Sequence, residues 1–133
     1  MPPPLVLFLN LFIMKVAHIN WISKDALEAE VVISDGQFQL LCFAQPFSGA
    51  INDIIESFPM AFDVIDIIKI DHDEFLINKL DGTFDQQISG KLIDKNAGLV
   101  KIGDIIVCID SKQIPGDIVE NDFIAFVCSR FDI

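Results

Sequence analysis

The feature that most constrains this fold is a series of short apolar stretches, rich in Ile and Phe, separated by turn-forming residues. Apolar and polar residues alternate within several stretches, which is the period of a strand with one buried face. β-branched and aromatic side chains also suit a pleated, half-buried surface. Asp-Gly, Pro-Gly and Asn-containing turns recur between the stretches, a spacing typical of all-β domains. The sequence therefore predicts a mostly β domain.

The clearest local prediction is a hairpin centred on Asp35-Gly36. In residues 27–33 every second side chain is apolar, and residues 37–43 show the same alternation. An Asp-Gly pair accepts the positive φ angles that tight hairpin turns require. Pro46 is expected to end the second strand, because proline lacks the backbone donor that a sheet uses.

Other stretches extend this pattern along the chain. Further strands are expected in residues 16–22, 62–70, 75–80, 84–93, 99–109 and 123–128. In the first of these, Ala17, Ile19 and Trp21 are expected to share one face. The stretch 99–109 is expected to bend at Gly103-Asp104, since glycine inside a strand marks a bulge or bend. We expect a small barrel or sandwich, OB-like among the barrel options, of about seven short strands with one short helix, and an α+β arrangement as the alternative.

The expected helix lies in residues 48–58, although a strand is the alternative there. Ser48 could cap its start and Pro59 would end it. The apolar residues follow the helical i, i+3, i+4, i+7 spacing: Ile51, Ile54, Ile55 and Phe58.

A chain of 133 residues, of which 52% are hydrophobic, can form one core without disulfides or a metal. The predicted core comprises the inward-facing side chains of the strands: Trp21, Val31, Ile33, Phe38, Leu40, Cys42, Ile88, Ile105, Val107, Ile109, Ile124 and Phe126.

Residues 1–13 (MPPPLVLFLNLFI) are apolar and uncharged. The apolar run in residues 5–13 is shorter than the roughly 20 residues needed to cross a bilayer. It also lacks the basic region that begins a signal peptide. We expect residues 1–13 to be an apolar leader outside the fold and residues 14–133 to be a single β-rich domain. An edge strand or swapped arm is the alternative for the leader.

The charge balance restricts the partners. Twenty acidic residues face nine basic ones, giving a net charge of -11. Such a charge repels phosphate backbones and anionic lipid surfaces, so nucleic acid and membrane partners are disfavoured. It attracts basic proteins, and it also keeps a small domain soluble.

Cys42, Cys108 and Cys128 are an odd number of thiols with no close pair, which argues against a disulfide framework. A reducing, cytoplasmic setting is expected. Cys42 and His18 could pair only if they shared a face, and the alternation places Cys42 inward and His18 on the polar side. A buried thiol is inert, so no catalytic residue is assigned.

The Asp71-His72-Asp73-Glu74 cluster holds the metal-ligand candidates. On an extended backbone alternate residues converge, so Asp71 and Asp73 could share a cation while His72 would point away. A solvated turn is the favoured interpretation, and no cofactor is expected. The only basic concentration is Lys91, Lys95 and Lys101.

The sequence alone does not assign a function. The favoured class is a non-catalytic acidic binding module for a basic protein partner. One alternative is a small metal-dependent or hydrolytic enzyme. The other is an OB-like nucleic-acid-binding module, which the net charge opposes.

Overall fold

The computed structural model describes residues 14–81 and 84–133, so the apolar leader lies outside the described residues. Every strand belongs to one 12-stranded mixed sheet, in the order β4-β1-β2-β3-β12-β5-β10-β9-β8-β11-β6, with β7 paired to β8 off this path. The strands are β1 (Met14–Ser23), β2 (Glu28–Ser34), β3 (Gln39–Ala44), β4 (Ile54–Ile55), β5 (Met60–Phe62), β6 (Ile65–Lys69), β7 (Leu76–Lys79), β8 (Gln86–Asp94), β9 (Leu99–Ile102), β10 (Ile105–Cys108), β11 (Phe123–Cys128) and β12 (Arg130–Asp132).

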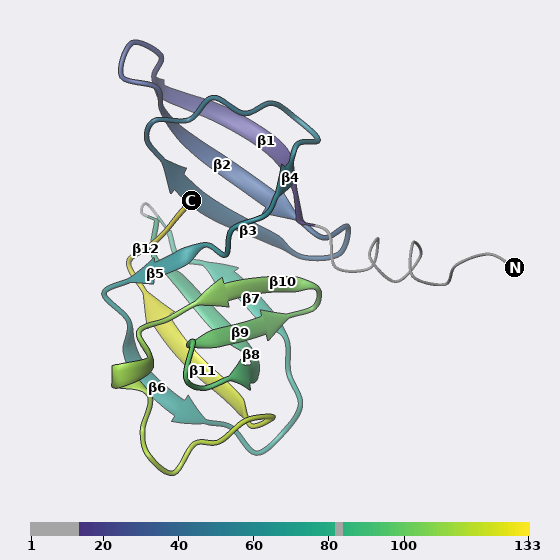
Figure 1. Cartoon of the computed structure of the whole chain (residues 1–133), viewed down its shortest axis with the longest axis vertical. Coiled ribbons are helices and arrows are strands. Elements are labelled where there is room, and N and C mark those ends of the chain that lie inside the picture. Colours follow the sequence, from purple (N-terminus) through teal and green to yellow (C-terminus); the bar gives the residue numbers. More distant parts are fainter. Residues whose placement is uncertain (1–13, 82–83) are drawn as a thin grey trace, which may run out of the picture.

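The mostly β prediction is confirmed. The sheet is open, however, because its terminal strands β4 and β6 do not pair with each other, so the barrel option of the predicted barrel or sandwich is not confirmed. Strands β1 to β4 form one end of the molecule and β6 to β11 the other (Figure 1). The described residues contain twelve strands where about seven were predicted. The stretch 99–109 divides into β9 and β10, β5 overlaps the expected strands only at Phe62, and β4 and β12 lie outside them. The only helical element in the described residues is the single 3-10 turn Ser111–Gln113.

The hairpin of β2 and β3 is confirmed, from the pair Ala29 and Ala44 to the pair Ser34 and Gln39. Its connection is longer than a two-residue turn. The Asp35 carboxylate accepts backbone hydrogen bonds from Gln37 (2.8 Å) and Phe38 (2.6 Å), which stabilise the wider loop.

Strand β1 contains a bulge at Ala17. Val16 pairs with Ile33 and His18 pairs with the adjacent Val32, so Ala17 has no counterpart in β2. The extra residue shifts the alternation of inward-facing and outward-facing side chains by one position. Val16 is therefore buried and Ala17 is exposed, and the prediction that Ala17 faces the core with the residues following it is wrong.

The predicted helix in residues 48–58 is wrong. The segment is a turn followed by the two-residue strand β4, which pairs with the start of β1. Asn52 has a φ of 73°, which is incompatible with a right-handed helix. The Asn52 amide donates to Val16 O (2.8 Å), and the Val16 amide donates to Asp53 O (2.9 Å). Pairing with a strand distant in sequence thus overrides the local helical spacing.

The predicted bend in residues 99–109 is a complete reversal. Strands β9 and β10 form an antiparallel hairpin in which Ile102 pairs with Ile105. Gly103, at the turn, has a φ of 59°, a conformation that glycine adopts without strain.

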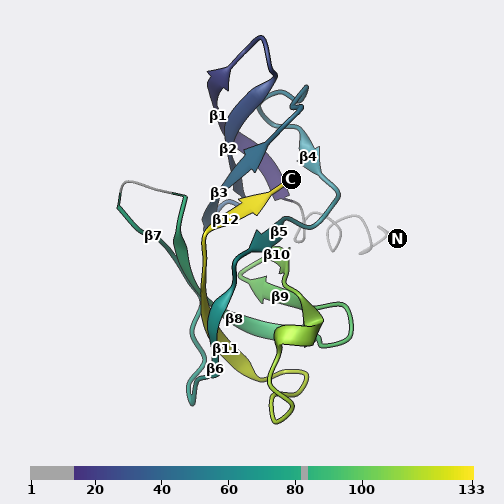
Figure 2. The same cartoon turned by 90° about the vertical axis from the view of Figure 1, so that its left-hand side faces the viewer.

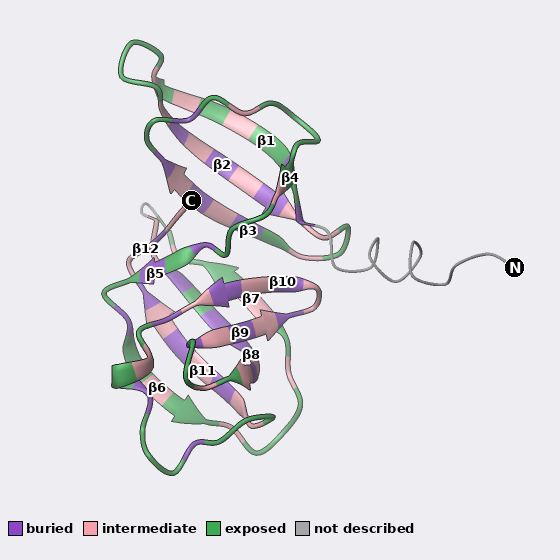
Figure 3. Ribbon diagram, in the orientation of Figure 1, coloured by how far each residue is buried: buried purple, intermediate pink, exposed green. Residues whose placement is uncertain are grey.

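The core follows the predicted alternation, visible as buried and partly exposed bands along the strands (Figure 3). All predicted core residues are buried except Trp21 and Phe38, which are partly buried and pack against the core. The two ends of the molecule meet where β12 pairs with β3 on one side and β5 on the other.

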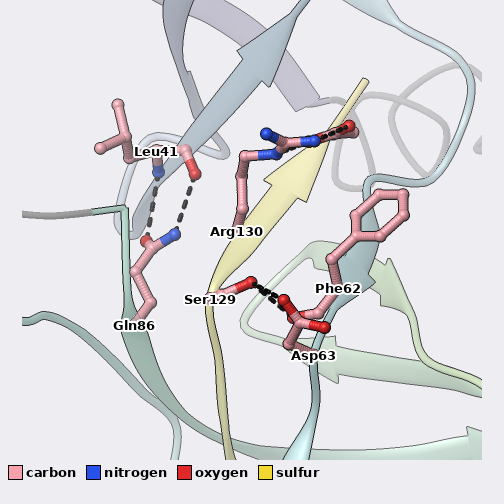
Figure 4. A network of polar contacts seen from close by, with 7 residues as sticks. Leu41, Phe62, Asp63, Gln86, Ser129 and Arg130 are labelled. Atoms are coloured by element: carbon pink, nitrogen blue, oxygen red, sulfur yellow. Dashed lines mark hydrogen bonds and ion pairs between the residues drawn. The ribbon is translucent and has the colours of Figure 1, made fainter.

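Gln86 and Arg130 hold this junction together (Figure 4). The buried side-chain amide of Gln86 accepts a hydrogen bond from the backbone N–H of Leu41 and donates one to its backbone oxygen. Gln86 thus makes the hydrogen bonds that a neighbouring strand would make with Leu41. Arg130 binds Asp132 through two nitrogens, at 2.6 and 3.0 Å, and lies 4.5 Å from the Phe43 ring centroid. The only arginine of the chain is thus a structural contact between distant strands.

Candidate functional site

Many carboxylates of this acidic chain cap turns. Five aspartates accept a hydrogen bond from a backbone amide two or three residues away: Asp35, Asp53, Asp94, Asp110 and Asp122. This is the arrangement by which aspartate stabilises turns. Five of the fifteen aspartates thus stabilise turns, and their carboxylates are already engaged.

The 71–74 cluster is a bend, so the alternation expected for an extended strand does not hold. The His72 ring lies 3.1 Å from the Asp71 carboxylate and 3.8 Å from Glu74. The hydrogen bond to His72 lowers the pKa of Asp71, and the same bond raises the pKa of His72. The prediction that His72 points away from Asp71 is wrong, whereas cation binding by Asp71 and Asp73 stays a prediction. Across residues 14–81 and 84–133, no three His, Cys, Asp or Glu side chains are grouped to hold a metal ion.

Cys42 and Cys128 are buried core residues, whereas Cys108 is only partly buried. Burial raises the pKa of Cys42 well above its usual value and that of Cys128 to about 12. Burial also raises the pKa of Cys108, whose Sγ lies 3.3 Å from Ala97 O. All three are therefore protonated near neutral pH. His18 is exposed on the opposite face of the hairpin from Cys42, so the two do not form a nucleophile and base pair.

A groove of about 510 Å³ is lined by residues of β1, β2, β3, β7 and β8. Figure 2 shows how β7 projects to one side of the sheet, next to β3 and β12. Its apolar lining residues are Val32, Leu41 and Ile77. Asn20 and Glu30 also line it, and the Asn20 side chain donates a hydrogen bond of 2.7 Å to the Glu30 carboxylate. Its other polar lining residues are His18, Gln39, Lys79 and Gln86. Among the described residues that line the groove, none is a serine, threonine or cysteine.

Strand β6 presents a different kind of surface. Within residues 14–81 and 84–133 it is the last strand of the sheet and pairs only with β11. Ile65 pairs with Val127, and Ile68 pairs with Ala125. Between these two pairs β6 advances by three residues while β11 advances by only two. The extra residue of β6 forms a bulge at Asp66, where φ is 57°. Directly paired residues share a face, so Ile65 and Ile68 both project from the same side, where they are 57% and 55% exposed.

Sequence reasoning did not identify this surface. The stretch 62–70 fits neither the helical nor the strand period well, and the bulge explains this, since it changes the period midway. We define the β6 edge as the outward side of residues 65–69.

Lys91, Lys95 and Lys101, which are close in sequence, do not form one basic cluster in the structure. Lys91 and Lys101 are direct neighbours on β8 and β9. The Lys95 ammonium group instead donates to the backbone oxygens of Pro115 (3.3 Å), Gly116 (3.2 Å) and Ile118. Lys95 therefore closes the 115–118 loop against the end of β8.

Replacing Lys95 with methionine is expected to lower the free energy of unfolding by about 1–2 kcal/mol, because three carbonyl groups lose a charged donor. Urea unfolding measures the effect. Lys112→Met is the matched control, since Lys112 is exposed and no side-chain contact is found for it in the described part of the chain. Equal losses in both variants would show that the carbonyl contacts do not stabilise the loop.

Comparison with known protein families, with curated proteins and with solved structures finds no match for this chain. Within the described ranges, no helix has the length and apolar character needed to cross a membrane.

Proposed function

We propose that this chain is a non-catalytic binding module that adds a strand of a basic protein partner to the β6 edge. The observation that carries the proposal is the position of β6 at the end of the sheet. Among the described residues, the outward backbone groups of β6 have no neighbouring strand. An extended segment can pair with such groups, and its main-chain hydrogen bonds then supply affinity.

The side chains of β6 add an apolar contact. Ile65 and Ile68 are each more than half exposed and lie on one face of the strand. Natural proteins usually protect an edge with charges or bulges. Here the bulge at Asp66 places the two isoleucines together, giving an apolar contact for an added strand.

Charge selects the partner. Asp66 is exposed within the strand, and the whole chain has a net charge of -11. A second copy of the chain carries the same charge and is repelled. A segment that alternates apolar and basic residues matches both the isoleucines and the acidic field.

The test uses an octapeptide of alternating valine and lysine, titrated into the full chain by isothermal calorimetry. We expect saturable binding that weakens as NaCl is raised, since salt screens exposed charges. The same peptide with glutamate in place of lysine is expected not to bind. Equal binding of both peptides, or binding that does not change with salt, would contradict the charge selection.

Asp66→Asn is expected to weaken binding of the valine-lysine peptide by roughly twofold to fivefold, the value of one exposed charge pair. Asparagine accepts the positive φ at this position, so the fold is kept. The matched control is Asp25→Asn, an exposed aspartate in the β1–β2 turn at the opposite end of the molecule (Figure 1). Equal weakening by both variants would show that only net charge matters and that β6 is not the site.

A further inference from the structure

A row of side chains crosses three strands on the outer face of the sheet. Phe123 of β11 pairs with Lys91 of β8, and Lys91 pairs with Lys101 of β9. Directly paired residues share a face. The register therefore brings one aromatic ring and two ammonium groups to the same surface.

The lysine pair is anomalous in this chain. Like charges directly opposite on neighbouring strands are destabilising, and the chain has only nine cationic residues against twenty acidic ones. Lys101 has internal contacts, with Gly103 O and with the Asp104 carboxylate at 3.7 Å. For the Lys91 ammonium group, no hydrogen bond or ion pair is found in the described ranges. Departures from local stability rules are expected where a residue serves function.

The row forms one wall of a groove of about 440 Å³. Phe75 lies across it, with its ring centroid 5.6 Å from that of Phe123 and 5.6 Å from the Lys101 ammonium nitrogen. Phe75 is 38% exposed, so part of its ring is open to a ligand. Asp73 and Glu74 complete the rim.

We propose that this groove binds a mononucleotide. The ammonium groups of Lys91 and Lys101 would hold its phosphates, because charge-assisted contacts to phosphate are strong. The exposed part of Phe75 offers a surface on which a base can stack. Asp73 and Glu74 are acceptors for sugar hydroxyls, a role that carboxylates fill in nucleotide sites. A mononucleotide carries few charges, so the acidic field that repels a nucleic acid polymer opposes it much less. This proposal is independent of the β6 edge.

The test is calorimetric titration of the full chain with ADP, with adenosine and with pyrophosphate. We expect saturable ADP binding, and weaker binding of both partial ligands because each makes only some of the contacts. Lys91→Ala is expected to weaken ADP binding roughly tenfold, and Phe75→Leu to weaken ADP without affecting pyrophosphate. Lys112→Ala is the control, with an exposed lysine elsewhere. It should bind ADP like the parent chain.

Lys91→Ala also has a second readout. Removal of one of two opposed ammonium groups should leave the melting temperature equal or higher, while ADP binding weakens roughly tenfold. No saturation by millimolar ADP would overturn the proposal, as would equal weakening by Lys112→Ala. Pyrophosphate binding as tight as ADP binding would overturn the role of Phe75 and show a simple anion site.

Discussion

Replacing Gln86 with glutamate is expected to lower the free energy of unfolding by about 3–5 kcal/mol, the range found when a buried charge loses its partner. Gln86 is 1% exposed, and its amide nitrogen donates to Leu41 O (2.9 Å) while its oxygen accepts from Leu41 N (3.3 Å). An ionised glutamate has no donor for the Leu41 carbonyl group. It would also place a negative charge against that oxygen at the junction of the two ends of the sheet.

Urea unfolding at neutral pH measures this loss. Gln87→Glu is the matched control, because the neighbouring Gln87 is exposed on the other face of β8 and undergoes the same chemical change. Its effect should stay within about 0.5 kcal/mol. Similar losses at both positions would show that the contact with Leu41 does not hold the junction.

The second large effect is expected at Asp35. Replacing Asp35 with alanine should lower the free energy of unfolding by about 2–3 kcal/mol, since three backbone amides, two of them in partly buried hydrogen bonds, lose a charged acceptor. Its carboxylate accepts from the backbone amides of Gln37 and Phe38 in its own loop and from that of Asp104 (2.7 Å) in the β9–β10 turn. It therefore ties two distant hairpins together. Asp25→Ala, at an exposed aspartate in the β1–β2 turn, is the control and should have little effect.

The contribution of Asp35 should also depend on pH. Partial burial raises the pKa of this carboxyl, but the bonds from Phe38, Asp104 and Gln37 outweigh burial, so its pKa lies below the ordinary 3.8. A lowered folded-state pKa means that the stabilisation is complete above the unfolded-state pKa and is lost as the pH falls through the folded-state value. The stability gap between the parent chain and Asp35→Ala should be widest at neutral pH and narrow below pH 4. A gap that stays constant down to pH 3 would contradict this.

The alternation of apolar and polar residues in the sequence was sufficient to predict the mostly β class and most of the core residues. Val31, Leu40 and Ile88 are buried because alternation in a half-buried strand determines which face each residue takes. The hairpin at Asp35 was also predictable, because both strands and the turn residues are contiguous in sequence.

Long-range pairing was not predictable from local pattern. Residues 48–58 have helical spacing, yet β4 forms because the start of β1 lies beside it. The candidate surfaces depend on the same kind of information. Only the strand order shows that β6 ends the sheet, and only the register shows that Lys91 faces Lys101.

The central claim is that the β6 edge accepts a basic strand, and the location of peptide binding tests it most directly. The measurement is a titration of the ¹⁵N-labelled chain with the valine-lysine octapeptide, followed by amide chemical shifts. We predict that the largest shift changes lie in residues 65–69, and that methylating the central backbone nitrogens of the peptide abolishes them. Shift changes centred on the groove beside β7, or unchanged binding of the methylated peptide, would contradict strand addition at β6.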